Sequence, residues 1–223
     1  MFDEKADTYD SWYQTGLGSF VDEVETKLAF DMFTPEKNMK VLDVGCGTGN
    51  FTLKLAQKQC FVVGIDISEK MLKIAREKIK DSDYGIEFYN MDIYSLEFPD
   101  EAFDAVFSMA TFEFIHKPHA AFMELQRVLK PGGQILIGTI NRDSHWGRKY
   151  LKAACRPDSI FRFASFMTLE ELEGLDRENL LDSRECLFIP PSANKEQINW
   201  EEEKRLSKIN SGGYICALWR KPK

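Results

Sequence analysis

Three glycines alternate with other residues in Val41–Phe51, "VLDVGCGTGNF". Such a turn at the end of a strand lets the backbone approach a ligand, because glycine adopts φ above zero without steric cost. A pyrophosphate-binding turn has the spacing G-x-G-x-x-G. Here the third glycine comes one residue early, at Gly49, and Asn50 stands where the dinucleotide turn has glycine. The spacing makes NAD the weaker alternative and indicates another ligand.

Three aspartates stand where predicted strands end. Asp43 precedes the first glycine by two residues, Asp66 ends the run "FVVGID", and Asp92 follows "IEFYNM". An acidic residue in the place of Asp66 can accept both hydroxyls of a ribose. A pocket with these carboxylates suits a ligand that carries positive charge and adenine amino donors better than a pyrophosphate. S-adenosylmethionine, with its sulfonium and ammonium groups, has that chemistry.

The elements that position these residues alternate between Met39 and Ile140. Short apolar runs and longer amphipathic segments follow one another, which is typical of a parallel α/β sheet with right-handed crossovers and helices on both faces. Ser68 is a predicted N-cap, and Pro131 with the two glycines after it ends a helix. The predicted strands are 40–45, 61–68, 86–92, 103–111 and 134–140, and the predicted helices are 49–59, 68–81 and 118–130.

The flanking segments are less regular. Residues 1–38 are aromatic and acidic, and we expect them to be helical and to pack across the top or edge of the sheet. Residues 141–167 lack a clean period and are predicted to be an irregular or short-helical insertion. Thr168 and Glu171 have capping-box spacing at the start of a helix over 168–175. Two strands, 183–190 and 213–221, are expected on either side of a helical segment over 195–209.

Length and composition set the frame. With 223 residues, 43% of them hydrophobic, and no internal repeat or clear linker, the chain is predicted to be one domain. We divide it into an N-terminal helical lid (1–38), a cofactor-binding core (39–140), a substrate-cap insertion (141–167) and C-terminal helices and strands (168–223).

Charge, cysteine spacing and hydropathy predict where the protein is located and which partners it has. The net charge of -7 disfavours a nucleic-acid partner. The five cysteines contain no C-x-x-C pair, which favours reduced thiols and no metal site. The acidic N-terminus lacks the apolar region of a signal peptide, and no apolar run approaches the roughly 20 residues of a membrane span. We therefore expect a cytoplasmic protein without a membrane partner, as a monomer or homodimer.

Four stretches in combination carry a family resemblance. "VLDVGCGTGNF", "GIDISEKML", "NMDIYSLEFPDEAFDAVFS" and "LQRVLKPGGQILIGT" follow one another in an order and spacing that resemble class I S-adenosylmethionine-dependent methyltransferases. The chain is most similar to the small-molecule branch that includes the quinone-biosynthesis C-methyltransferases, over Asp3 to Ile140. The resemblance implies an α/β fold with a Rossmann-like, doubly wound, mostly parallel seven-stranded sheet, helices on both faces and an antiparallel last strand.

The resemblance also implies a set of cofactor contacts. The first motif would hold the methionyl part, Asp66 the ribose, and Asp92 with the Ile93 N–H the adenine, while the end of the fourth strand would lie below the sulfonium. An aromatic helix at the N-terminus would lie over the cofactor, with the Tyr9 hydroxyl on its carboxylate. The implied cofactor-binding residues are Tyr9, Asp43, Gly45, Cys46, Gly47, Gly49, Asp66, Ile67, Met71, Asp92, Ile93, Ser108, Met109 and Ala110.

The transferred group and its acceptor give a second set of predictions. Methyl transfer from a sulfonium is an in-line displacement that leaves S-adenosylhomocysteine, and hydroxyl or amine acceptors benefit from a base. Related methyltransferases often have a His-His pair after the fourth strand, where this chain has Glu113 and Phe114. Glu113 is thus the predicted base or substrate-orienting carboxylate; the alternative is an ion pair with Arg142 or His145.

Acceptor contacts are predicted for Tyr13, Arg142 and Trp146. The aromatic and basic residues of 141–167 suggest an acceptor that is aromatic or anionic, although the same residues could form an apolar cap or a dimer surface. Tyr13, like Tyr9, could instead only pack the N-terminal helix on the core. The function that the sequence favours is methyl transfer to a small molecule. The alternatives are a protein or RNA acceptor and a cofactor-binding regulator without turnover.

Overall fold

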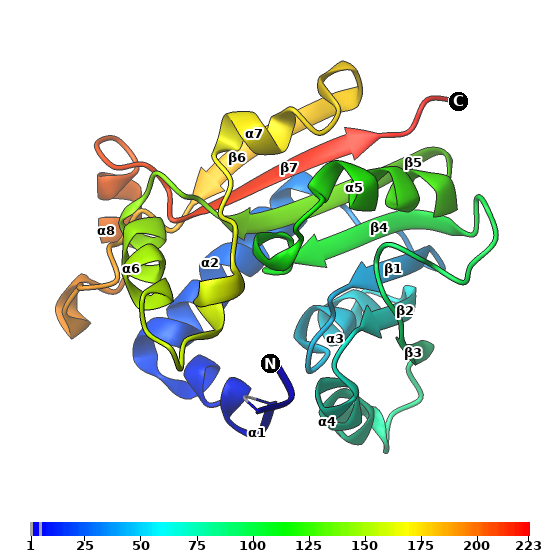
Figure 1. Ribbon diagram of the computed structural model, residues 1–223, viewed down its shortest axis with the longest axis horizontal. Helices are drawn as coiled ribbons and strands as arrows, with labels where there is room; N and C mark the ends of the chain where they lie inside the picture. The colour runs from blue at the N-terminus through cyan, green and yellow to red at the C-terminus, as the bar shows by residue number, and fades with distance from the viewer. Residues whose placement is uncertain (1, 5) are drawn as a thin grey trace.

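Seven strands form one sheet in the computed structural model, which describes residues 2–4 and 6–223. The strand order is β3-β2-β1-β4-β5-β7-β6 (Figure 1). The first five strands are parallel, and β7 runs antiparallel to both of its neighbours. The predicted fold class is confirmed. The strands are β1 (Lys40–Val44), β2 (Phe61–Asp66), β3 (Ile86–Asn90), β4 (Phe103–Met109), β5 (Leu129–Ile140), β6 (Leu180–Cys186) and β7 (Tyr214–Arg220).

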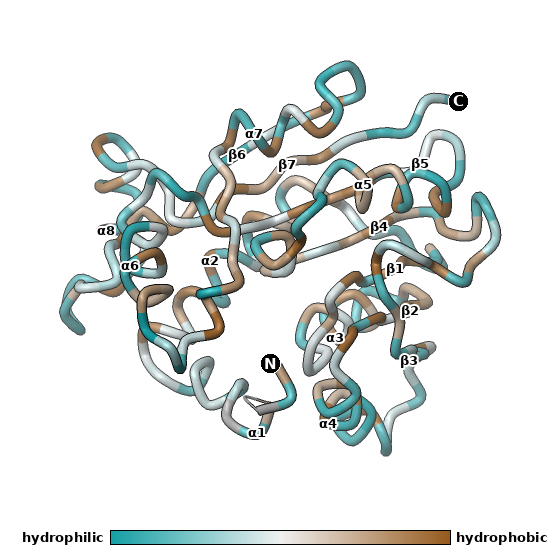
Figure 2. Tube along the Cα trace, viewed as in Figure 1, coloured by the Kyte–Doolittle hydropathy of each residue, from teal (hydrophilic) through white to brown (hydrophobic). Residues whose placement is uncertain are grey.

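Helices cover both faces of the sheet. On one face Val24 and Leu28 of α2 join Leu55 of α3 in a buried cluster, and on the other Phe122 and Leu125 of α5 do the same. The outward side of α4 is hydrophilic, whereas the strands carry hydrophobic stretches (Figure 2). The α-helices are α1 (Ala6–Tyr9), α2 (Gly16–Met32), α3 (Asn50–Gln57), α4 (Glu69–Ile79), α5 (Pro118–Val128), α6 (His145–Ala154), α7 (Leu169–Glu173) and α8 (Trp200–Leu206).

The topology locates a ligand site. From β1 the chain moves outward through β2 to β3, and β4 then returns to the other side of β1. Open α/β sheets bind ligands where the strand order reverses in this way, beyond the carboxyl ends of the strands. That switch point lies between β1 and β4, at the end of β1 that the glycine turn follows.

Two predicted helix starts are confirmed. The Ser68 Oγ accepts a hydrogen bond from Met71 N at 3.2 Å and so caps α4. Thr168 and Glu171 form both bonds of the capping box at the start of α7. In each case a side chain satisfies backbone N–H groups that the first helical turn leaves without a partner.

Several boundaries differ from prediction. Helix α5 ends at Val128 rather than 130, and β5 begins at Leu129, because the Pro-Gly-Gly stretch forms a bulge in the strand with Gly132 at φ 77°. Strand β6 lies over 180–186, three to four residues earlier than expected, and Leu187 has left-handed backbone. The predicted helix over 195–209 is split, with Asn199 capping α8.

The segment 141–167 is more regular than predicted. It contains the ten-residue helix α6, capped by Ser144, whose Oγ accepts from Gly147 N at 2.9 Å. Around it the chain returns to the sheet through a parallel bridge between Asn141 and Met167. No helix in the described part of the chain is both long and apolar enough to span a membrane.

Candidate functional site

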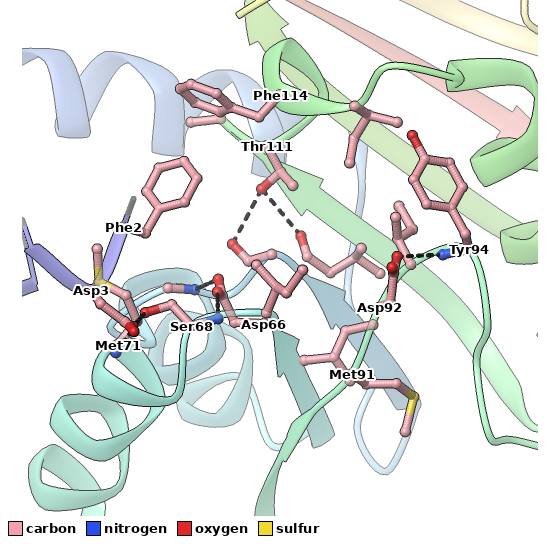
Figure 3. A pocket seen from close by; sticks show the side chains of 18 of the residues that line it. Phe2, Asp3, Asp66, Ser68, Met71, Met91, Asp92, Tyr94, Thr111 and Phe114 are labelled. Carbon is pink, nitrogen blue, oxygen red and sulfur yellow. Dashed lines mark hydrogen bonds between the residues drawn. The ribbon is translucent and has the colours of Figure 1, made fainter. Parts of the chain in front are cut away.

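A cavity of about 490 Å³ lies beyond the carboxyl ends of β1 and β2 (Figure 3). Its size is in the range of small-molecule sites. Side chains and backbone of the N-terminal segment, the glycine turn, the start of α4 and the loops after β3 and β4 line it. The predicted cofactor residues among them are Tyr9, Gly45, Gly47, Asp66, Ile67, Met71, Asp92, Ile93 and Ala110.

The glycine turn explains why its glycines alternate. Gly45, Gly47 and Gly49 have φ angles of 67°, 54° and 80°, in the left-handed region that favours glycine. A Cβ at Gly45 would lie 2.2 Å from the Thr111 Oγ1. Gly49 is the residue from which α3 starts. The turn therefore brings bare backbone to the cavity wall and then begins a helix.

Asp66 holds this turn in place. Its Oδ2 accepts from Gly47 N at 2.9 Å and its Oδ1 from Ser68 N at 2.8 Å. A carboxylate has about four acceptor positions, so each oxygen keeps capacity for a ligand hydroxyl. Burial raises the pKa of Asp66. The side chain is thus fixed by two backbone donors at the cavity wall (Figure 3).

Asp43 lies behind the turn rather than on the cavity wall. It is buried, and its Oδ2 accepts from the Thr52 Oγ1 on α3 at 2.5 Å. Burial, with a smaller contribution from the Asp66 charge, raises the pKa of Asp43 to about 7. The carboxyl ties β1 to α3 below the glycines, and its predicted contact with a cofactor stays a prediction.

The other predicted cofactor residues outside the lining also serve the turn or the strand ends. Ser108 Oγ donates to Val44 O at 3.0 Å and links β4 to β1. Met109 is buried. Burial raises the pKa of the Cys46 thiol, which favours a neutral side chain that packs. Gly49 contributes its backbone conformation.

The N-terminal segment covers the cavity. Phe2 lies edge-on to Phe114 of the η3 turn (Phe112–Phe114), with ring centroids 4.9 Å apart, and Asp3 Oδ1 accepts from Ser68 Oγ at 2.5 Å. Both N-terminal residues line the cavity, as does Tyr9. The segment therefore contacts the cavity wall on the β2 side and on the β4 side (Figure 3).

Asp10 fastens this cover to the glycine turn. Its Oδ1 accepts from Thr48 Oγ1 at 2.7 Å, and its Oδ2 pairs with Lys78 Nζ of α4 at 2.8 Å. Since Tyr9 is the adjacent residue, the clamp also sets where the Tyr9 side chain enters the cavity.

The loop after β4 forms the opposite wall. Ala110 has φ 54°, and its N–H is shared between Gly138 O at 3.0 Å and the Tyr214 hydroxyl at 2.7 Å. The Thr111 Oγ1 lies 3.2 Å from Gly45 O and 3.4 Å from Val44 O. These bonds join the wall to the glycine turn (Figure 3).

Glu113 follows directly and is 2% exposed. Its Oε2 accepts from the Thr139 Oγ1 at 2.9 Å, and its main-chain oxygen accepts from Ser165 N at 2.6 Å. Burial raises the pKa of Glu113 to about 7. The charge of Glu113 also contributes to the raised pKa of Tyr9, about 12, which is due mainly to burial. Glu113 is thus buried next to the cavity wall, within electrostatic reach of Tyr9.

None of the three predicted acceptor residues lines the cavity. Tyr13 contacts Tyr9, with ring centroids 5.9 Å apart. Arg142 pairs with Glu171 at 3.0 Å, so the alternative ion pair of Arg142 with Glu113 is not formed. Trp146 is 2% exposed, and its Nε1 donates to Ile189 O at 2.8 Å. Trp146 is therefore a core residue, whose predicted acceptor contact has no support in this geometry.

Comparison with known proteins supplies the family. A family model described as a methyltransferase domain matches residues 42–137. The ubiquinone biosynthesis O-methyltransferase of Thiobacillus denitrificans is 32% identical over 165 residues, 70% of this chain and 69% of that protein. The chain belongs to the S-adenosylmethionine-dependent methyltransferases. An uncharacterized protein of Methanocaldococcus jannaschii is 32% identical to this methyltransferase over 178 residues, which cover 80% of this chain and 79% of that protein.

A solved structure agrees with this assignment. A methyltransferase of Thermotoga maritima, described as S-adenosylmethionine-dependent and as a possible histamine N-methyltransferase, has a TM-score of 0.74 at 26% identity and covers 99% of this chain and 98% of its own. The predicted family, enzyme class and cofactor of the present methyltransferase are confirmed. The NAD alternative, already disfavoured by the glycine spacing, is wrong.

Sequence reasoning missed part of the methyltransferase cavity. Thr111 is a missed residue with a usable signal, because it is a polar residue at the end of a predicted strand, at the ligand edge of the sheet. Phe2, Asp3 and Asp10 lie in a segment without periodicity, and their contacts are with residues more than 35 positions away. No local pattern marks such residues.

Proposed function

We propose that this methyltransferase transfers the methyl group of S-adenosylmethionine to a small-molecule acceptor. The observation that carries the proposal is the cover over the cavity, where Phe2 reaches Phe114 and Asp3 bonds Ser68 on opposite walls. A cavity of about 490 Å³ bordered by this segment has the size of a small-molecule site. The names of two similar proteins, an O-methyltransferase of ubiquinone biosynthesis and a possible histamine N-methyltransferase, support a small acceptor.

For the cofactor we propose the following contacts. Asp66 accepts the ribose hydroxyls, since its backbone donors leave acceptor capacity on both oxygens. The bare backbone at Gly45 and Gly47 lies along the methionyl part. The loop after β3 contacts adenine through Asp92 and Ile93, both of which line the cavity.

For the transfer step we propose that the chain aligns and encloses its reactants. The cofactor supplies an electrophilic methyl group on a sulfonium, and the protein holds the acceptor in line with it and excludes water. Residues 1–38 act as the lid in this proposal. If the acceptor carries a proton, Glu113 receives it on its carboxylate, whose raised pKa of about 7 suits a base at neutral pH.

Calorimetric titration with S-adenosylhomocysteine tests the cofactor site. Replacing Asp66 with Asn removes the charge and one acceptor, and we expect the affinity to fall about 10- to 100-fold. The same change at exposed Asp83 is the control and should leave the affinity unchanged. Equal affinities in both variants would contradict the proposed ribose contact.

Methyl-labelled cofactor offered with sets of small acceptors tests transfer. We expect label to appear in one chemical class of acceptor. Normal binding of S-adenosylhomocysteine without transfer to any acceptor would instead favour the regulator without turnover.

A further inference from the structure

A second pocket lies between α6 and the loop that follows β6. Its volume is about 450 Å³, and it shares no lining residue with the cavity described above. Four basic residues of α6 form one wall, and two residues of the loop form the other. The lining residues are His145, Arg148, Lys149, Lys152, Pro191 and Ser192. The lining contains no carboxylate.

The four basic residues occupy one face of α6. They follow one another at i, i+3, i+4 and i+7 from His145, a spacing that places side chains on the same side of a helix. The other side of the helix faces the protein. Trp146 and Gly147 are buried, and Tyr150 packs against Phe161 with ring centroids 4.2 Å apart. Packing of this inner side therefore fixes the direction in which the basic side chains point.

No anionic group pairs with these basic side chains. Within residues 2–4 and 6–223, none of the four forms an ion pair. Arg148 Nη1 donates to the main-chain oxygen of Asp143 at 3.3 Å, and the Lys149 ammonium lies 5.1 Å from the centroid of the Trp146 ring. Burial lowers the pKa of Lys149, an effect that an adjacent carboxylate would oppose. The pocket therefore presents positive charge that a ligand can neutralise.

The charge of this segment is opposite to that of the whole chain. Residues 145–162 contain five lysines and arginines and a single carboxylate, Asp158, whereas the net charge of the chain is -7. A local region of one sign attracts ligands of the other sign and raises their local concentration. The acidic remainder of the chain repels a long polyanion such as a nucleic acid. A compact anion that fits the pocket is the better match.

Hydrogen bonds hold the loop wall in place. Trp146 Nε1 donates to Ile189 O at 2.8 Å and so joins α6 to the loop. The buried carboxylate of Glu203 on α8 accepts from Phe188 N and Ile189 N, both at 3.0 Å. Pro191 follows two residues later. The two walls of the pocket are therefore held together before any ligand binds.

Ser192 adds neutral hydrogen-bond donors to the cations. Neither its hydroxyl nor its N–H donates to an acceptor in the described part of the chain. Phosphate oxygens accept hydrogen bonds from hydroxyl and backbone N–H groups as well as from arginine and lysine. The facing walls thus combine the kinds of donor that bind a phosphate group.

We propose that this pocket binds a phosphomonoester, carried by a small soluble molecule or by a lipid headgroup. Its phosphate group, which carries close to two negative charges at neutral pH, lies against Arg148 and Lys149 and accepts from Ser192 on the facing loop. A carboxylate offers only one charge to the same cations. Because the pocket shares no residue with the methyl-transfer cavity, the inference does not rest on the proposed function.

An NMR titration with phenyl phosphate tests the inference. The protein is saturated with S-adenosylhomocysteine, so that the probe cannot occupy the cofactor site. We expect saturable shifts of the Ser192 amide and of the Trp146 indole N–H signals, with a Kd of about 1 mM or lower. Benzoate, which has the same ring and one charge, should bind about 10-fold more weakly. Absence of saturation, or equal affinity for the two probes, overturns the inference.

Variants separate the pocket from the net charge of the protein. Arg148→Gln and Lys149→Gln should each weaken binding of phenyl phosphate about 10-fold, because each removes a charge-assisted hydrogen bond. Lys73→Gln, at an exposed position of α4, changes the net charge equally and should leave the affinity unchanged. Equal affinities in all three variants overturn the assignment to this pocket. Thermal melts verify that each variant is folded.

Co-sedimentation with phosphatidylcholine vesicles, with and without phosphatidic acid, separates the two sources of the phosphate. Binding that requires phosphatidic acid and is lost in Lys149→Gln supports a lipid headgroup. No binding to either kind of vesicle, while phenyl phosphate still binds, supports a soluble phosphomonoester. Vesicle binding without saturable binding of phenyl phosphate overturns the inference.

Discussion

The two halves of the cavity are built in different ways. The half formed by β1, β2 and the glycine turn uses backbone, with three left-handed glycines and a single carboxylate, Asp66, fixed by two N–H groups. The half toward the N-terminal segment and the loop after β4 uses side chains, among them Tyr9, Thr111 and Phe114. Backbone recognition suits a constant cofactor. A side-chain lining can change its chemistry without altering the fold, which suits an acceptor site.

The strongest test of the backbone half is Gly45→Ala. The new Cβ would lie 2.2 Å from Thr111 Oγ1 on a residue with φ 67°, so the turn must shift. We expect the affinity for S-adenosylhomocysteine, measured by calorimetry, to fall about 100-fold or more. Gly16→Ala, where a Cβ meets nothing within 4 Å, is the control. Wild-type affinity in Gly45→Ala would mean that the turn does not support the cofactor.

Glu113→Gln should affect turnover without affecting cofactor binding. Loss of a base should lower kcat about 100-fold and leave cofactor affinity intact. Since the pKa of Glu113 is raised to about 7, wild-type turnover should rise with pH through 7 as the carboxyl loses its proton. The Gln variant should lose that rise. A pH profile of kcat for both proteins measures the effect, and identical profiles would remove Glu113 from the mechanism.

Ionisation of Glu25 should make the thermal stability of the protein depend on pH. Burial raises the pKa of Glu25 to about 8 in the folded protein, so the folded state binds more protons than the unfolded chain above the ordinary pKa of about 4.5. The free energy of unfolding is therefore not reduced by Glu25 below about pH 4.5, and it decreases as pH rises from there to about 8. Glu25→Gln should therefore raise Tm at pH 9 relative to wild type by about 5 °C, and by less at pH 5. Thermal melts of both proteins at pH 5 and pH 9 measure this difference. An equal change in Tm at both pH values would contradict the raised pKa of Glu25.

The smallest effect is expected for the clamp on the cover. Asp10→Asn keeps a polar side chain but loses the ion pair with Lys78, and partly exposed pairs contribute roughly 1 kcal/mol or less. The affinity for S-adenosylhomocysteine should fall about 2- to 5-fold. Exposed Asp7 in the same segment gives the control, Asp7→Asn. A loss as large as that of Gly45→Ala would show that the cover, not the turn, dominates cofactor binding.

The same contrast explains what the sequence could predict. Strand ends, the glycine turn and Asp66 follow from local spacing, because hydrophobic period and backbone chemistry are properties of neighbouring residues. The sequence places Asp43 in the right strand, but its side chain bonds to Thr52 on α3 and does not line the cavity. Which face a strand residue presents depends on the helix that packs there.

Buried side chains away from the glycine turn resisted prediction for the opposite reason. Glu25 occupies a buried position of an amphipathic helix, where the period alone predicts an apolar residue. Trp146 is of a residue type that often contacts ligands, but its side chain fills the core beneath α6, and its N–H donates to Ile189 O. The contacts of such residues are with segments that are distant in the sequence, so a local pattern does not predict them.

The bond between Ala110 N and the Tyr214 hydroxyl joins residues 104 positions apart. Tyr214 belongs to β7, which inserts between β5 and β6 although both precede it in the chain. Contacts that close such long loops form late, because the chain entropy must be lost before they form. We therefore expect the wall of the methyl-transfer site to assemble late in folding. During refolding, binding of S-adenosylhomocysteine should lag behind the recovery of helical circular dichroism, so the ligand reports completion of the native state.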